Sequence, residues 1–402
     1  MSDVLSDMLR VVRLRGAIFS YVECTDPWVA ETPRSREIIP AIMPGVEHLM
    51  PFHGVATGTC WASLVNDEPV RLDEGDLALF PLGDHHILSS APGLRAKAVD
   101  PSAYFAPRPD QLPHDLSVTE SGLSPRRENA GPVRNTVVCG FLGCDANPVN
   151  PLLASMPKIL RMPRVAPDGS SWIGDFIHLM VVESRLKRPG GEAVLERMSE
   201  MLFVEVIRRY VDMLPAGQTG WLAGLRDPAV GRALAIIHDR PAVPWTLERL
   251  GEAAAVSRSV LNERFALLIG QPPMQYLTRW RMQLAAASLR DTDAKVVDVA
   301  DQVGYETEAA FSRAFRRAVG ESPGAWRRTL RAAADPNLTG PSPPRSRASP
   351  ARAPCARRRD RPSRQLQRGR RHRAPARARP GCAGARARSS RRATWPSRRW
   401  RR

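Results

Sequence analysis

Two segments in the C-terminal half of the chain share one design and lie about fifty residues apart. They read "TLERLGEAAAVSRSVLNERFALLIG" at 246–270 and "VVDVADQVGYETEAAFSRAFRRAVG" at 296–320. In each segment apolar residues recur at three- and four-residue spacing, stop at a short break and then resume. Each therefore predicts a helix, a tight turn and a second helix, and together they predict an all-α domain with two helix-turn-helix units.

The apolar positions indicate which helix faces pack inward. The first unit has Leu247, Leu250 and Ala254 before a break at 256–257, and then Val260, Leu261, Phe265 and Leu268 on one face. The second has Val297, Ala300 and Val303, and then Phe311, Phe315 and Val319. Gly304 suits a turn with positive φ, and Thr307 can cap the helix that follows.

The helix between the two units, at 273–290, would be about 27 Å long at 1.5 Å per residue. Major-groove segments recur every ~34 Å along one face of B-DNA. The second helix of each unit can therefore enter one of two successive segments. This arrangement favours sequence-specific binding to double-stranded DNA.

The stretch "RMQLAAASLRDTDAKVVDVADQVGYETEAAFSRAFRRAVGESPGAWRR" closely resembles the DNA-binding domain of the AraC/XylS family of bacterial transcription regulators. The matching features are "R-x-x-x-A", "VA-x-x-VGY", Phe311 with Phe315, and "G-x-SP". The resemblance covers residues 228–332, and residues 1–215 resemble the branch of the family with a cupin-like sensor. It implies an N-terminal cupin that senses a small-molecule effector and dimerises, with RNA polymerase as a candidate partner.

Position on the helices selects the residues that would face DNA. The predicted base contacts are Ser259, Asn262, Glu263, Glu308, Ala309 and Arg313. The predicted backbone contacts are Arg258, Thr307, Arg316 and Arg317. Arg313 is the strongest candidate for a base contact, because a bidentate arginine on guanine is the commonest specific contact. The two glutamates would either accept hydrogen bonds from cytosine or exclude wrong binding sites. The alternative is that all of these residues form solvated faces of a helical bundle.

Residues 16–105 consist of short strand-like runs punctuated by Gly, Pro and Asp. The runs are "GAIFSYVE", "REIIPAIM", "HLMPFHGVATGTCWASLV", "VRLDEGDLALFPLG" and "HHILSS". Their spacing predicts a sandwich or barrel, with a long loop at 106–133 and a further strand in "RNTVVCGFLGCD". A short helix is expected at 3–13. Amphipathic helices at 170–187 and 191–214 would pack on the sheet or on a second subunit.

The stretch "GDLALFPLGDHHIL" at 75–88 fits the second cupin motif, G-x5-P-x-G-x2-H. The companion motif of metal-dependent cupins supplies two histidines and a glutamate. In "PFHGVATGTCW" only the first histidine is present, as His53. Val55 stands where the second histidine should be, and Thr59 or Cys60 stands in place of the glutamate. Catalytic metal sites usually have three or more protein ligands, so no catalytic metal is expected.

The same residues suggest two other uses of the barrel interior. The predicted effector pocket contains His53, Trp61, Phe80 and His86. The alternative is a rebuilt zinc site of His53, Cys60 and His86, with His48 or His85 as a further ligand. His85 and His86 lie on opposite faces of one strand, so at most one points inward. In the simplest interpretation His53 and His86 only donate hydrogen bonds inside the barrel.

The net charge of +18 is concentrated at the C-terminal end. Residues 336–402 contain 22 of the 59 basic residues and one acid, Asp360, which leaves 37 basic and 40 acidic residues in 1–335. The tail has too few apolar residues to form a core and is predicted to be disordered. Its Arg, Pro, Ala, Gly and Ser are also what a GC-rich gene yields when read out of frame, so we hypothesise a frameshift or read-through product.

The whole chain is predicted to be a multidomain α+β protein. Its parts are a cupin-like effector-sensing β-barrel at 1–150, a helical connector for dimerisation at 151–226, the double helix-turn-helix domain at 227–332, and the Arg/Pro-rich tail at 336–402. Six cysteines without CxxC spacing and the absence of a long apolar run favour the cytoplasm and no membrane span.

The predicted function is a sequence-specific transcription regulator, with no catalytic residues and no cofactor. Two alternatives stay open. One is a cupin-type metalloenzyme fused to a DNA-binding module. The other is a non-specific nucleic-acid binder that uses the basic tail.

Overall fold

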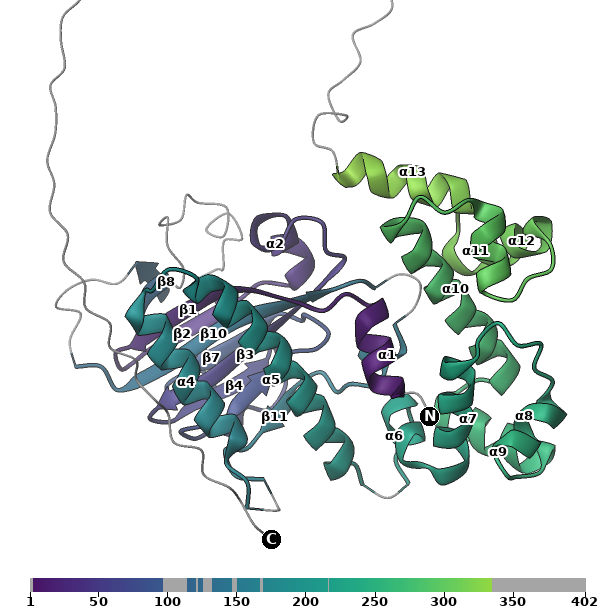
Figure 1. Ribbon diagram of the computed structural model, residues 1–402. Helices are drawn as coiled ribbons and strands as arrows, with labels where there is room; N and C mark the ends of the chain where they lie inside the picture. The colour runs from purple at the N-terminus through teal and green to yellow at the C-terminus, as the bar shows by residue number, and fades with distance from the viewer. Residues whose placement is uncertain are drawn as a thin grey trace, which may run out of the picture. The chain divides into compact units, whose positions relative to one another are not determined.

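The computed structural model describes residues 3–96, 114–120, 122–125, 132–146, 150–166, 169–215 and 217–334. These described residues belong to one compact unit, which Figure 1 shows in ribbon form. The predicted tail lies outside the described residues. No helix in the described ranges is long and apolar enough to cross a bilayer.

The N-terminal part contains two β-sheets, and its β-rich fold is confirmed. The larger sheet has the order β11-β6-β3-β10-β1-β8-β9 and the smaller has the order β2-β7-β4-β5. The strands are β1 (Arg15–Cys24), β2 (Val29–Thr32), β3 (His48–Thr57), β4 (Cys60–Leu64), β5 (Val70–Leu72), β6 (Leu77–Leu79), β7 (His86–Ser89), β8 (His114–Thr119), β9 (Gly122–Pro125), β10 (Asn135–Cys144) and β11 (Leu160–Met162). One apolar cluster draws on both sheets, with Val22 and Val55 from the larger and Ala62 and Leu88 from the smaller. The sheets therefore share a core.

Two expectations about this part are wrong. The run "REIIPAIM" is not a strand but belongs to α2 (Ser35–Ile42), in which Ile38 and Ile42 are buried and pack with Leu49. Those two isoleucines are four residues apart, so the run also has helical spacing, and tertiary packing selects the helix. The predicted loop at 106–133 contains β8 and β9, which pair with each other, and β8 also pairs with β1. Their sequences, "HDLSVT" and "GLSP", are short and mostly polar, so apolar periodicity does not reveal them.

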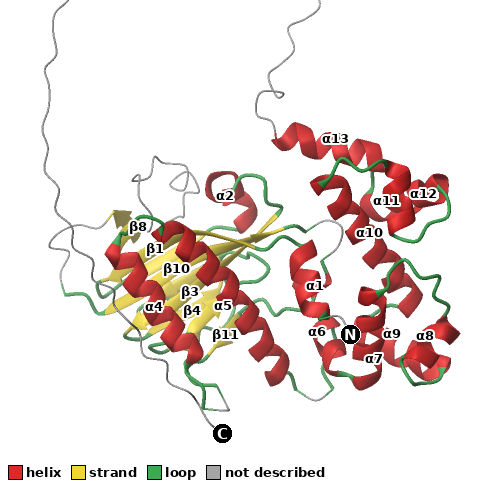
Figure 2. Cartoon of the chain, in the orientation of Figure 1, coloured by secondary structure: helices red, strands yellow, loops and turns green. Residues whose placement is uncertain are grey.

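Helices pack against the larger sheet (Figure 2). The short helices α1 (Val4–Val11) and α3 (Pro151–Ala154) precede α4 (Trp172–Leu186), which contacts β3, and α5 (Gly191–Met213), which contacts β1. Gly16 on β1 permits this close approach, because a Cβ there would lie 2.1 Å from the Ser199 hydroxyl oxygen and 2.4 Å from the Glu196 carbonyl oxygen. A larger residue at position 16 would push α5 away from the sheet.

The described C-terminal part is helical, and the predicted double helix-turn-helix is confirmed. Its helices are α6 (Trp221–Arg226), α7 (Pro228–Asp239), α8 (Leu247–Ala253), α9 (Arg258–Ile269), α10 (Pro273–Asp291), α11 (Val296–Gln302), α12 (Glu308–Val319) and α13 (Pro323–Ala334). Ser257 caps α9 and Thr307 caps α12, so the second unit repeats the first fifty residues later.

Two inward positions in this domain, Val297 and Val260, are wrongly predicted. Val297 is 48% exposed, whereas Val299 on the same helix is fully buried. Val260 is 41% exposed, whereas Leu261 and Phe265 are fully buried. Because successive residues turn by about 100° around a helix, the residue before Leu261 leaves the inward face.

Candidate nucleic-acid interface and barrel interior

The first turn of α9 is held by its cap and its core. The Ser257 hydroxyl accepts a hydrogen bond from the Val260 N–H at 3.3 Å. Leu261 and Phe265 lie in the core of the first unit at 0% exposure. The opposite face of α9 is therefore available to a ligand.

The residues predicted to contact DNA from α9 all lie on its surface. Ser259, Asn262 and Glu263 are exposed, and Ser259 and Glu263 lie opposite the buried face. Arg258 is also exposed, and its Nη1 atom lies 3.0 Å from Oε1 of Glu248 on α8. This ion pair spans the turn and holds the arginine beside the start of α9.

The second unit places its predicted contacts in the same way. The Thr307 hydroxyl accepts from the Ala310 N–H at 3.2 Å, and Phe311 and Phe315 are fully buried. The exposed residues of α12 include every predicted contact of this helix, namely Glu308, Ala309, Arg313, Arg316 and Arg317. Thr307 itself is exposed too. The outward surface of α12 is therefore rich in arginine.

Arg281 on α10 ties the two units together, a role that was not predicted from the sequence. Its guanidinium donates to the carbonyl oxygens of Pro241 at 2.7 Å, Val243 at 3.0 Å and Gly304 at 3.3 Å. The first two belong to the segment before α8, and the third belongs to the turn of the second unit. Burial lowers the pKa of Arg281 from its usual value. The only sequence signal was its place at the head of the "R-x-x-x-A" pattern.

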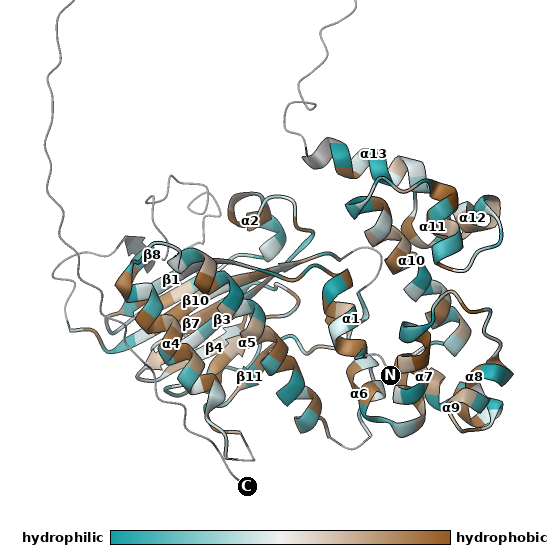
Figure 3. Cartoon of the chain, viewed as in Figure 1, coloured by the Kyte–Doolittle hydropathy of each residue, from teal (hydrophilic) through white to brown (hydrophobic). Residues whose placement is uncertain are grey.

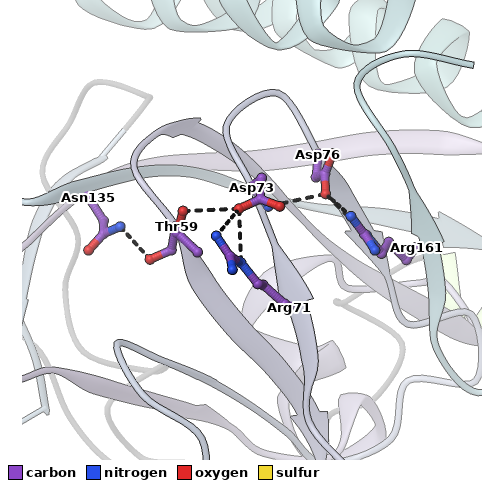
Figure 4. A network of polar contacts seen from close by, with 6 residues as sticks. All are labelled: Thr59, Arg71, Asp73, Asp76, Asn135 and Arg161. Carbon is purple, nitrogen blue, oxygen red and sulfur yellow. Dashed lines mark hydrogen bonds and ion pairs between the residues drawn. The ribbon is translucent and has the colours of Figure 1, made fainter.

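The second cupin motif begins with a turn that Asp76 anchors (Figure 4). The Asp76 side chain accepts from Arg161 Nη2 at 2.7 Å, from the Arg164 N–H at 2.9 Å and from the Asp73 N–H at 3.1 Å. Gly75 has a φ of +84°, and a Cβ there would meet the Arg164 side chain at 2.6 Å. This turn therefore connects the sheet to the segment that leads into α4.

His53 of β3 and His86 of β7 meet in the interior with their Nε2 atoms 2.9 Å apart. The Nδ1 atom of His86 lies 2.9 Å from the carbonyl oxygen of Asp84, which can only accept a hydrogen bond. His86 therefore carries its proton on Nδ1 and accepts at Nε2 from His53. The Nδ1 atom of His53 is then an acceptor, and the Cys139 thiol, 2.9 Å away, donates to it. The three side chains form a neutral, directional chain of hydrogen bonds.

Three of the four residues predicted for the effector pocket lie together. Phe80 stacks on His86 with ring centroids 3.8 Å apart, and His53 is 5.8 Å from Phe80. His53 is 5% exposed and the other two are 0% exposed, so these rings pack as core. Trp61 does not join them, because its neighbour Cys60 points into the core and adjacent strand residues face opposite sides.

The zinc alternative named Cys60, but the thiol that contacts His53 belongs to Cys139. Burial raises the pKa of Cys60 to about 12. Within the described ranges no group of three or more His, Cys, Asp or Glu side chains could hold a metal ion. His85 points away from the interior and lies 3.0 Å from Oε2 of Glu31, as the strand alternation predicted.

A hollow of about 300 Å³ opens at Asp84 and His85, the two residues that precede His86 in the sequence. Its walls include Arg34, Asp84, His85 and Lys158. Asp84 borders this hollow, and its carbonyl oxygen accepts from His86. A polar ligand in the hollow would therefore contact Asp84, the residue whose carbonyl oxygen accepts from the interior chain of hydrogen bonds.

The buried histidines predict that stability falls as the solution becomes acidic. Burial lowers the pKa of His86 to about 4, and it lowers the pKa of His53 well below its usual value. An unfolded imidazole titrates near pH 6.5, so between pH 6.5 and 4 the unfolded state binds more protons. The contribution of the neutral histidines to the free energy of unfolding is thus fully present above about pH 6.5 and is lost as the pH falls. Protonation linked to His86 lowers the free energy of unfolding by about 3 kcal/mol at pH 4.

Urea denaturation of the whole chain from about pH 7 to about pH 4 measures this loss. His86→Gln does not titrate in that range, so its decline with pH is expected to be shallower. His238, whose pKa burial lowers to about 3, adds to the decline equally in both proteins. Identical slopes for wild type and variant would contradict the assignment to His86.

Comparison with known proteins covers both parts of the chain. A Cupin family model matches residues 3–212, which include α4 and α5, and a Helix-turn-helix domain model matches residues 250–329. An AraC-like transcription regulator of Streptomyces lividans is 32% identical over 332 residues, which are 81% of this chain and 98% of that protein. The HTH-type transcriptional regulator AlkR of Acinetobacter baylyi is 25% identical over 330 residues, 81% of this chain and 99% of AlkR.

One similar solved structure contains nucleic acid. It is the DNA-binding domain of the transcriptional factor AdpA in complex with a target DNA. It is 31% identical and covers 26% of this chain and 95% of its own, with a TM-score of 0.25.

Proposed function

The chain belongs to the family of AraC-like transcription regulators, and we propose that it binds specific promoter DNA through both helix-turn-helix units under the control of its cupin domain. One observation carries the DNA-binding role. All ten residues predicted to contact DNA are exposed, and the two helices that bear them are capped and packed in the same way. The proposed roles of these residues are those predicted from the sequence. We place the protein in the bacterial cytoplasm, where the chromosome lies.

Selection of duplexes from a random pool by the full chain tests this function. We expect enrichment of a site with two parts, because two recognition helices read two segments of major groove. Retention of random duplexes without enrichment would instead favour a non-specific binder that acts through the basic tail. Stoichiometric metal together with substrate turnover would favour the metalloenzyme alternative.

The cupin domain is proposed to sense a small molecule beside the His53–His86 pair. Supporting this, the hollow is lined by Asp84, whose carbonyl oxygen accepts from His86, and Cys139 places β10 in contact with His53. The sheet is also closely packed against α5 at Gly16, so a change in the sheet would shift that helix. The effector must bind two arrangements of these elements with unequal affinity to act as a switch.

A homodimer is proposed to form through the outer surfaces of α4 and α5. Figure 3 shows hydrophobic segments on both helices. The exposed apolar side chains that form the proposed contact are Leu179, Val182, Leu186, Val194 and Met201, which are 39–56% exposed. On α4 they recur at spacings of three and four residues, and on α5 at seven, so each helix has an outward apolar stripe. Such a stripe can pair with its own copy across a two-fold axis, and RNA polymerase stays a candidate partner for the assembled regulator.

Met201→Glu is expected to weaken self-association by about tenfold or more, because a carboxylate would be buried at the proposed contact. Sedimentation equilibrium of the full chain measures the dissociation constant. Met213→Glu is the matched control, since Met213 is 39% exposed on the same helix but lies a third of a turn away from the stripe. A wild-type chain that is monomeric, or equal effects of the two variants, would exclude this interface.

A further inference from the structure

Val260 is an exposed apolar side chain in the first turn of α9. It is 41% exposed, and its N–H is held by the Ser257 hydroxyl, so its position on the helix is fixed. The inward face is filled by Leu261 and Phe265, which are fully buried. Core packing therefore does not account for a valine at this position.

The two recognition helices differ sharply in charge on their outward faces. On α9 this face consists of Ser259, Val260, Glu263 and Leu267, with one carboxylate and no cation. Arg264, one turn after Val260, is exposed as well, but its guanidinium is paired with Asp227. The residues fifty positions later on α12 are Ala309, Ala310, Arg313 and Arg317. The α12 face can neutralise phosphates and bind guanine, whereas the Glu263 carboxylate repels phosphates.

The two exposed arginines of α9, Arg258 and Arg264, are each paired with a carboxylate, so the side chains around Val260 are suited to base edges rather than to phosphates once the helix lies in the major groove. The first turn of a recognition helix is the part that contacts base edges. Among the four bases only thymine presents a methyl group there, and apolar side chains contact it. Resting on the proposed function, we propose that Val260 contacts a thymine 5-methyl group and determines specificity at that position of the binding site.

Replacement of thymine by deoxyuridine tests this contact, because it removes only the methyl group. In the duplex enriched by the full chain, each thymine is replaced in turn and the dissociation constant is measured. One replacement is expected to lower wild-type affinity by about fourfold, which is the factor for one buried methyl-sized contact. The thymine concerned should lie outside the base pairs at which Arg313→Ala lowers sequence specificity. Val260→Ala is expected to lose about fourfold on the thymine duplex and to lose nothing further on the deoxyuridine duplex.

Val297→Ala is the matched control. Val297 is 48% exposed and lies on α11, outside both recognition helices, so this variant is expected to discriminate thymine from deoxyuridine as wild type does. The proposal is overturned if Val260→Ala keeps the wild-type discrimination, or if wild type is indifferent to every replacement. An enriched site without methyl dependence refutes only the role of Val260, whereas no enriched site refutes the proposed function together with it.

Discussion

Arg313→Ala is expected to lower affinity for the preferred site by roughly tenfold to a hundredfold, since a bidentate arginine on guanine contributes about 1–3 kcal/mol of discrimination. Arg313 is exposed on α12, and Phe311 and Phe315 anchor the opposite face of that helix. Loss of the guanidinium removes a base contact without disturbing the core. Affinity for random DNA is therefore expected to fall far less.

Arg317→Ala is the control for Arg313→Ala, because Arg317 lies on the same outward side of α12 and is proposed to contact the backbone. It should weaken binding to preferred and random DNA alike and reduce the salt-dependence slope by about 1. Titrations of both variants on both DNAs at several salt concentrations give the comparison. Equal losses on the two DNAs for Arg313→Ala would show that Arg313 is a phosphate contact.

Gly304→Ala is expected to destabilise the C-terminal domain by about 3 kcal/mol, because a strained backbone and a steric clash act together. Gly304 has a φ of +79°, and a Cβ there would lie 2.4 Å from the carbonyl oxygen of Ala242. That oxygen belongs to the backbone segment that Arg281 holds, so it cannot move away freely. The clash would also disturb the hydrogen bond between Arg281 and the Gly304 carbonyl oxygen.

Gly320→Ala separates the two causes. Gly320 has a φ of +94°, but a Cβ added there would meet no atom within 4 Å, so only the backbone strain of about 1–2 kcal/mol is expected. Chemical denaturation of the full chain, followed through the transition of the helical C-terminal part, measures both variants. If Gly320→Ala is as damaging as Gly304→Ala, contact with Ala242 has no role in fixing the two units.

Much of the DNA-binding domain could be predicted because its signals are local. Helical spacing, the turn at Gly304 and the cap at Thr307 each involve residues close in sequence, and the structure confirms all three. Val260 was wrongly predicted to be buried because it is five residues before Phe265, at the edge of the apolar face. Apolar spacing of three and four residues does not show where that face ends. Burial of Leu261 and Phe265 in three dimensions decides which side of α9 faces inward.

The sensor domain was harder to predict because its elements are short and their partners are distant. The isoleucines of α2 suit a strand as well as a helix, and the polar strands β8 and β9 have no apolar pattern. His53 and His86 were identified from the cupin motifs, but Cys139 was not. It comes beside His53 only through the pairing of β10 with β3, in which these two residues are direct partners.

Local pattern was sufficient to establish a double helix-turn-helix domain and a cupin motif that has lost ligands, since hydrophobic periodicity and motif spacing are written in adjacent residues. Long-range packing established the rest. It assembled His86, His53 and Cys139 into one neutral chain, placed Arg281 between the two units and turned Val260 outward. These features depend on strand register and on contacts between residues tens of positions apart, and no short stretch of sequence encodes either.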